Sequence, residues 1–137
     1  MTATGSCLCA RVRFRVDGPL RPVIACHCVQ CRKTSGHYVA ATAAARGAVT
    51  VEGEVAWYAS SPTARRGFCP VCGSSLFWDG PGTHLSIHAG TLDTHPDGLA
   101  VAGHIFCADA GRYYAIPEDL PRAEADDPRL TTQVVPG

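Results

Sequence analysis

The sequence has no net charge, a single lysine and no long apolar segment, and two of these absences limit what the protein can be. Twelve basic residues balance twelve acidic ones over 137 residues. A balanced charge does not favour the basic surface of a nucleic-acid-binding protein. No apolar run approaches the roughly 18 residues that a membrane span needs. The first residues, MTATGSCLC, also lack the basic and apolar segments of a signal peptide. We therefore expect a cytoplasmic protein with no membrane partner.

Cysteine is the abundant residue type that carries the most information. The chain has eight cysteines, and in a reducing compartment such a number favours metal binding or catalysis over a disulfide framework. A disulfide scaffold and an iron site stay open as alternatives, since four thiolates can hold iron as well as zinc.

Hydrophobic periodicity predicts a mainly β protein with at most one or two short helices. Residues 11–16, RVRFRV, alternate basic and apolar side chains, and THLSIHAG around Leu85 alternates polar and apolar ones. A period of two is typical of a strand. Residues 48–51 and 55–58 predict a hairpin around Gly53. The segment YVAATAAARG is ambiguous between helix and strand, and we favour strand.

The length indicates one domain, large enough to bury a core without external staples. We place this domain at residues 1–121. The last residues, from Pro121, contain three prolines and several acids with little apolar periodicity. We therefore expect residues 122–137 to form an extended C-terminal tail.

Two cysteine pairs have the spacing of half-sites for one metal. In extended chain Cys7 and Cys9 of CLC point the same way, so both sulfurs can face one centre. Cys69 and Cys72 of CPVC have the spacing of a zinc knuckle. Together the pairs would complete a four-thiolate structural zinc site that ties the N-terminus to the middle of the chain.

A third cluster, CHCVQC, supplies three cysteines: Cys26, Cys28 and Cys31. Structural zinc sites are closed by protein ligands, whereas catalytic sites keep one position for water or substrate. Cys107, in an expected strand, could close the fourth corner, although a lone cysteine there is more often a small buried hydrophobe.

The histidines compete poorly for that fourth corner. His27 would point away from its cysteine neighbours in extended chain. His84 and His88 are four residues apart, which separates them by roughly 13 Å along a strand, so at most one could bind the metal. A core or surface role is the simpler interpretation for each.

Four basic residues lie next to the cysteines: Arg32, Lys33, Arg65 and Arg66. Zinc with three thiolates carries a net charge of about −1, so adjacent cations would stabilise the loaded site. They could also bind carboxylates of an anionic substrate. Solvated surface charge is the alternative for each of them.

The ordered set of motifs resembles the glutathione-dependent formaldehyde-activating enzyme family, which includes the centromere-protein-V-like proteins. The resemblance covers roughly residues 5 to 121 and rests on GSCLCARVRF, CHCVQCRKTSG, GFCPVCGSSLF, GTLD, HIF and DLP. It implies a tent-like arrangement of short β-sheets stabilised by zinc. It also implies two Zn²⁺ sites, a structural one at Cys7, Cys9, Cys69 and Cys72 and a labile one at Cys26, Cys28 and Cys31.

The resemblance further implies an activity at the labile site. That activity is the addition of a small-molecule thiol, glutathione or an equivalent, to formaldehyde or a related aldehyde, giving an S-hydroxymethyl adduct, and its reversal as a carbon-sulfur lyase. A zinc centre deprotonates a thiol of pKa about 8.5 and brings both partners together. We identify no general acid or base in the sequence. The alternative is a zinc-stabilised binding or thiol-sensing module of the same fold without catalysis.

Overall fold

The computed structural model describes residues 2–132, which form two β-sheets, two short α-helices and three 3₁₀ turns. One sheet has three strands in the order β1–β2–β5, namely β1 (Thr2–Ser6), β2 (Arg13–Asp17) and β5 (Val49–Glu52). The other has seven strands in the order β10–β3–β4–β9–β8–β7–β6. These are β3 (Val23–Cys26), β4 (Val39–Ala45), β6 (Ala56–Ala59), β7 (Arg65–Phe68), β8 (Ser75–Asp79), β9 (His84–His88) and β10 (Val101–Ile105).

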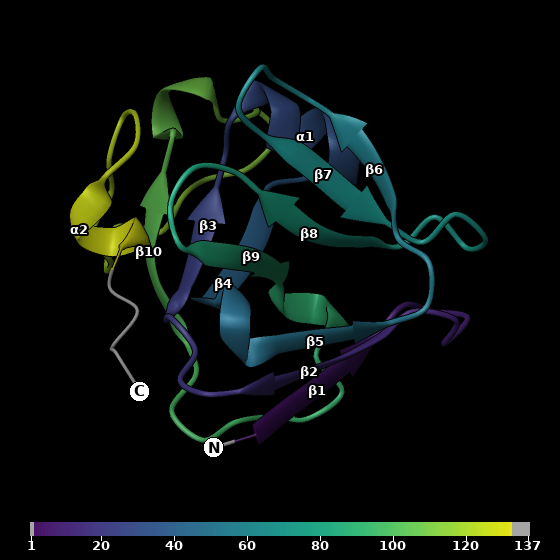
Figure 1. Ribbon diagram of the computed structural model, residues 1–137. Helices are drawn as coiled ribbons and strands as arrows, with labels where there is room; N and C mark the ends of the chain where they lie inside the picture. The colour runs from purple at the N-terminus through teal and green to yellow at the C-terminus, as the bar shows by residue number, and fades with distance from the viewer. Residues whose placement is uncertain (1, 133–137) are drawn as a thin grey trace.

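The helices are few and short. They are α1 (Val29–Ser35) and α2 (Pro128–Thr131), and the 3₁₀ turns are η1 (Arg46–Ala48), η2 (Ala89–Thr91) and η3 (Cys107–Asp109). Figure 1 shows the three-stranded sheet below the larger sheet, α1 at the opposite side of the larger sheet, and α2 beside β10. The prediction of a mainly β fold of short sheets with at most two short helices is confirmed. No helix in the described residues is long and apolar enough to cross a membrane.

The main core fills the space between the two sheets. Phe14 and Val16 of β2 face Phe77 and Ile87 of the larger sheet, and all four are nearly inaccessible to water. The rings of Phe14 and Phe77 meet edge to face with centroids 5.4 Å apart, a geometry that adds about 1 kcal/mol to the gain from burial. Their alternation with exposed Arg13 explains the period of two in β2, so the strand predicted there is confirmed.

The strands predicted around Leu85 and in the alanine-rich segment are also confirmed, as β9 and β4. The hairpin predicted over residues 48–58 is wrong. Gly53 does turn the chain, with a φ of 94° and with no room for a side chain beside the Arg11 carbonyl oxygen. However, β5 pairs with β2 and β6 pairs with β7, so the turn passes the chain from one sheet to the other.

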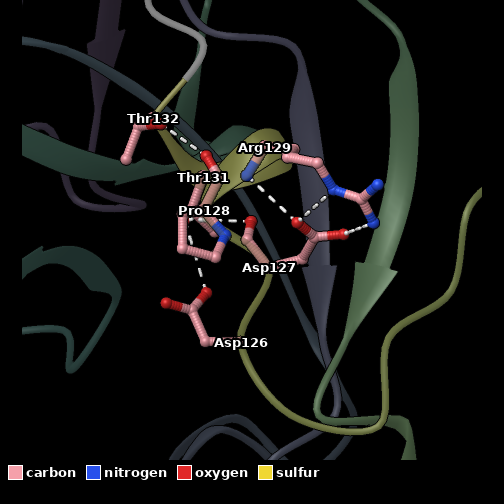
Figure 2. Close-up of polar contacts among 6 residues, drawn as sticks. All are labelled: Asp126, Asp127, Pro128, Arg129, Thr131 and Thr132. Carbon is pink, nitrogen blue, oxygen red and sulfur yellow. Dashed lines mark hydrogen bonds and ion pairs between the residues drawn. The ribbon is translucent and has the colours of Figure 1, made fainter.

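The C-terminal segment packs on the edge of the larger sheet. Amides of β10 and of the residues after it donate to carbonyls of residues 121–125, for example His104 to Pro121. Leu130 of α2 is buried against Ile24 and Ile105. Asp127 caps α2 by accepting from the Arg129 amide and pairs with its guanidinium, as Figure 2 shows.

This packing differs in part from the extended tail that we expected. Residues 121–123 lie beside β10, with a parallel bridge between Arg122 and His104. The helix α2 was not predicted, because a helix of four residues leaves almost no periodic signal. The predicted tail residues 133–137 lie outside the described residues.

Candidate metal centres

The first cysteine cluster joins the loop after β1 to the loop after β7. The sulfurs of Cys7, Cys9, Cys69 and Cys72 all lie within 4.8 Å of one another. The Cys7 and Cys9 sulfurs are 3.6 Å apart, and those of Cys9 and Cys69 are 3.7 Å apart. Four sulfurs at about 2.3 Å from zinc define a tetrahedron with edges of about 3.8 Å, so the spacing fits a four-thiolate zinc site.

Backbone amides point at these sulfurs. The amide of Val12 donates to the Cys7 sulfur at 3.3 Å, and the amide of Val71 donates to the Cys69 sulfur at 3.4 Å. Gly73 closes the knuckle, because its amide reaches the Cys69 carbonyl at 2.9 Å and its φ is 77°. Such donors favour the thiolate form that binds metal.

The second cluster lies where β3 meets α1. The sulfurs of Cys26, Cys28 and Cys31 lie within 4.8 Å of one another. Cys28 is the N-cap of α1, and its sulfur accepts from the Cys31 amide at 3.3 Å. The helix therefore starts at the cluster and turns Cys31 inward, where it is buried against the sheet.

The pKa values of the three thiols in the second cluster are shifted in opposite directions. The pKa of Cys28 is lowered to about 2, first by hydrogen bonds with Cys26 and then with Cys31, and also by the nearby charge of Arg66. The hydrogen bond to Cys28 raises the pKa of Cys26. The cluster thus holds a thiolate readily, and a metal ion could take the place of the protons that remain.

Arg66 of β7 is a buried cation with no carboxylate partner among residues 2–132. Only 9% of it is exposed, and its two terminal nitrogens lie 3.8 Å from the Cys31 sulfur. A buried charge is costly unless it is compensated. The charge of about −1 on zinc with three thiolates would balance it, so the surroundings of the cluster fit a loaded metal site.

A pocket of about 320 Å³ opens beside Arg66. It is lined by Thr34, Tyr58, Arg66, Gly67, Phe68, Gly73, Ser75, Phe77 and His88. Since Arg66 also contacts Cys31, this arginine lies between the pocket and the second cluster. A volume at the small end of ligand pockets suits a small molecule.

The neighbours Arg65 and Arg66 were both expected near substrate, but successive strand residues face opposite sides of a sheet. Arg65 pairs with Asp79 at 2.9 Å and its guanidinium lies 4.0 Å from the centre of the Trp57 ring. Arg32 donates to the Asp109 carbonyl, and Lys33 is exposed on α1. Of the four expected basic residues, the structure brings only Arg66 to the pocket.

His27 points away from the second cluster, as extended chain requires. It is buried between two hydrogen bonds, with Nε2 at 3.0 Å from His104 Nδ1 and Nδ1 at 2.5 Å from the Tyr114 hydroxyl oxygen. Burial, with the nearby His104, lowers the pKa of His27 to about 4. Its anchorage fixes the backbone from which the cysteines on either side project.

Cys107 lies outside the second cluster in the described residues, and it sits in η3 rather than in the strand that we expected. The backbone of Phe106 is left-handed and ends the extended conformation, so β10 stops at Ile105, two residues before Cys107.

Sequence reasoning did not place His88 at the pocket, where the structure has it. The alternation of THLSIH places His84, Ser86 and His88 on one face of β9. The sequence does not show on which side of the larger sheet this face lies, because that depends on how β9 pairs with β4 and β8.

Comparison with known proteins agrees with this arrangement. The chain is 32% identical over 75 residues to an uncharacterized lyase of Schizosaccharomyces pombe, an alignment covering 54% of this chain and 55% of the relative. The chain thus spans about half the length of the curated relative that it matches. The model of a family described as glutathione-dependent formaldehyde-activating enzyme matches residues 2–109. Because this match covers well over half of the chain, the protein belongs to the glutathione-dependent formaldehyde-activating enzyme family.

Proposed function

We propose that the protein is a zinc-dependent carbon-sulfur lyase of the S-hydroxymethylglutathione synthase type. It would combine a low-molecular-weight thiol, glutathione or an equivalent, with formaldehyde or a related aldehyde, and reverse that reaction. Membership of the family and the similarity to a protein named as a lyase support this activity. One observation supports this proposal most directly. The second cluster has three cysteines rather than four, and Arg66, which contacts its Cys31, also lines the pocket.

The two clusters have different roles in this proposal. Cys7, Cys9, Cys69 and Cys72 hold a structural zinc whose coordination is complete. Cys26, Cys28 and Cys31 hold a labile zinc with one position left for substrate. A zinc bound there would lower the pKa of the incoming thiol and so favour its reaction with the aldehyde.

Residues of the pocket bind the rest of the thiol. The Nε atom of Arg66 is buried and has no hydrogen-bond partner in residues 2–132. Glutathione carries two carboxylates, and a guanidinium that lines the pocket is suited to bind one of them. Tyr58 and Phe68 add aromatic surface to the lining of the pocket.

The proposal is tested by counting zinc and following the reaction in one preparation. We expect two zinc ions per chain, one of which changes its coordination when thiol is added, and faster exchange between free thiol and S-hydroxymethyl adduct, measured by magnetization-exchange NMR. The Cys31→Ser variant should lose one zinc and the acceleration, whereas Cys107→Ser should keep both. Two zinc ions that do not respond to glutathione or other cellular thiols, with no acceleration, would instead support a non-catalytic binding module.

A further inference from the structure

His88 has a partly buried imidazole at the pocket. It lies at the end of β9 and lines the pocket beside Arg66. Its ring makes no hydrogen bond to any residue in the range 2–132, whereas both ring nitrogens of His27 are engaged. A half-buried polar ring that faces a cavity without a protein partner is available to a ligand.

The register of the larger sheet places His88 on the same side as the second cluster. His88 is opposite Ala41, and Ala41 is opposite Ile24 on the next strand. Residues opposite one another across a ladder share a face, as do residues two apart along a strand. Cys26, two residues after Ile24, therefore projects from the same face as His88.

Arg66 links the histidine to the cysteines. It lines the same pocket as His88, and its terminal nitrogens lie 3.8 Å from the Cys31 sulfur. A small molecule in the pocket would thus touch both His88 and the arginine that contacts Cys31.

The surroundings keep His88 uncharged at neutral pH. Burial, together with the positive charge of Arg66, lowers the pKa of His88 to about 4. A neutral imidazole can accept a proton, and an imidazolium formed in these surroundings readily passes it on.

We infer that His88 is the proton-transfer residue of the pocket, carrying the proton from the thiol sulfur to the carbonyl oxygen of the aldehyde. This inference rests on the proposed function. The sulfur lone pair forms the bond to carbon, the π pair of the carbonyl moves to oxygen, and the S–H proton passes through His88 to that oxygen. Thiol and aldehyde thus give the S-hydroxymethyl adduct with no proton gained or lost, and the reverse sequence cleaves it.

The test compares His88→Gln with His84→Gln, a control on the same strand and the same face. We expect His88→Gln to keep two zinc ions and its affinity for glutathione but to slow adduct exchange about 100-fold, within the range for general acid-base catalysis. His84→Gln should exchange at the wild-type rate. Added imidazole should restore part of the rate to His88→Ala, because the space left by the ring adjoins the pocket.

A second readout does not depend on turnover. In NMR spectra of the wild-type protein, glutathione alone should shift the His88 ring signals, assigned by their loss in His88→Gln, and leave those of His84 in place. A wild-type rate in His88→Gln would overturn this inference alone. Loss of one zinc in that variant would also overturn it, since His88 would then be a metal ligand. A wild-type protein without acceleration would overturn the proposed function, and this inference with it.

Discussion

At the scale of single residues, burial and alternation separate side chains that the sequence presents as equivalent. Arg65 and Arg66 are adjacent, yet Arg65 is half-exposed in an ion pair and Arg66 is buried against Cys31. An exposed ion pair contributes at most about 1 kcal/mol. The buried cation acts on the thiolates at short range through a poorly screening medium. The two arginines therefore form a matched pair for testing charge at the second cluster.

We predict that Arg66→Met weakens zinc binding at the second cluster about tenfold, while Arg65→Met leaves it unchanged. The charge of Arg66 favours the thiolate forms of Cys28 and Cys31, so its loss makes protons compete better with zinc. Competition with a chromogenic chelator at several pH values measures the effect. The midpoint pH of zinc release should rise in Arg66→Met only. Equal affinities in the two variants would contradict the role given to Arg66.

The lowered pKa of His88 leads to a prediction about the stability of the protein in acid. Its pKa is lowered from 6.5 to about 4 in the folded protein, by burial and by Arg66. The unfolded chain therefore binds more protons between these values, so the stabilising contribution is complete above pH 6.5 and is lost as the pH falls towards 4. Between pH 7 and pH 5 the wild type should lose about 1–2 kcal/mol more unfolding free energy than His88→Gln.

Urea denaturation of both proteins at each pH measures this difference. Zinc release in acid affects both proteins alike and cancels in the comparison. Parallel losses in the two proteins would mean that His88 is not buried as described.

At the scale of elements, local patterns predicted strands well and pairing poorly. β2 and β9 follow from alternation within a few residues, because one face of each is buried. The turn at Gly53 was also correct, but whether β5 and β6 pair with each other depends on partners elsewhere in the chain. The cysteine clusters could be predicted, since ligand spacing is a local property. The pocket could not, because its wall combines α1, β7 and β9.

The C-terminal helix α2 has an energetic role that the sequence did not indicate. Its one buried residue, Leu130, fills the space over Gly103 and against Ile24 and Ile105. We predict that Leu130→Ala lowers the unfolding free energy by about 2–3 kcal/mol, through lost burial and a residual cavity. Val101→Ala on the adjacent strand, at a position that is 42% exposed, should cost less than about 0.5 kcal/mol. Chemical denaturation distinguishes the two, and equal small losses would mean that α2 does not pack as described.

At the scale of the whole molecule, the first cluster brings together cysteines that follow strands of the two different sheets. Its cysteines come from the loop after β1 and the loop after β7, which Figure 1 shows close together at the right of the view. Cys7 and Cys69 also belong to the buried core between the sheets. The second cluster joins only β3 to the helix that follows it, so it closes a short segment of chain. The same metal would thus have different consequences for stability at the two places.

We predict that Cys7→Ser and Cys31→Ser each remove one zinc but differ strongly in stability. Cys9 and Cys69 are 60 residues apart, and closing a loop of that length costs about 4 kcal/mol of chain entropy, which a metal in the first cluster offsets. Cys7→Ser should therefore lower the melting temperature by about 10–20 °C. Cys31→Ser should lower it by only a few degrees, because its ligands are already neighbours along the chain. Differential scanning calorimetry with zinc analysis of the same samples checks both values, and a larger loss in Cys31→Ser would reverse the structural and catalytic assignments of the clusters.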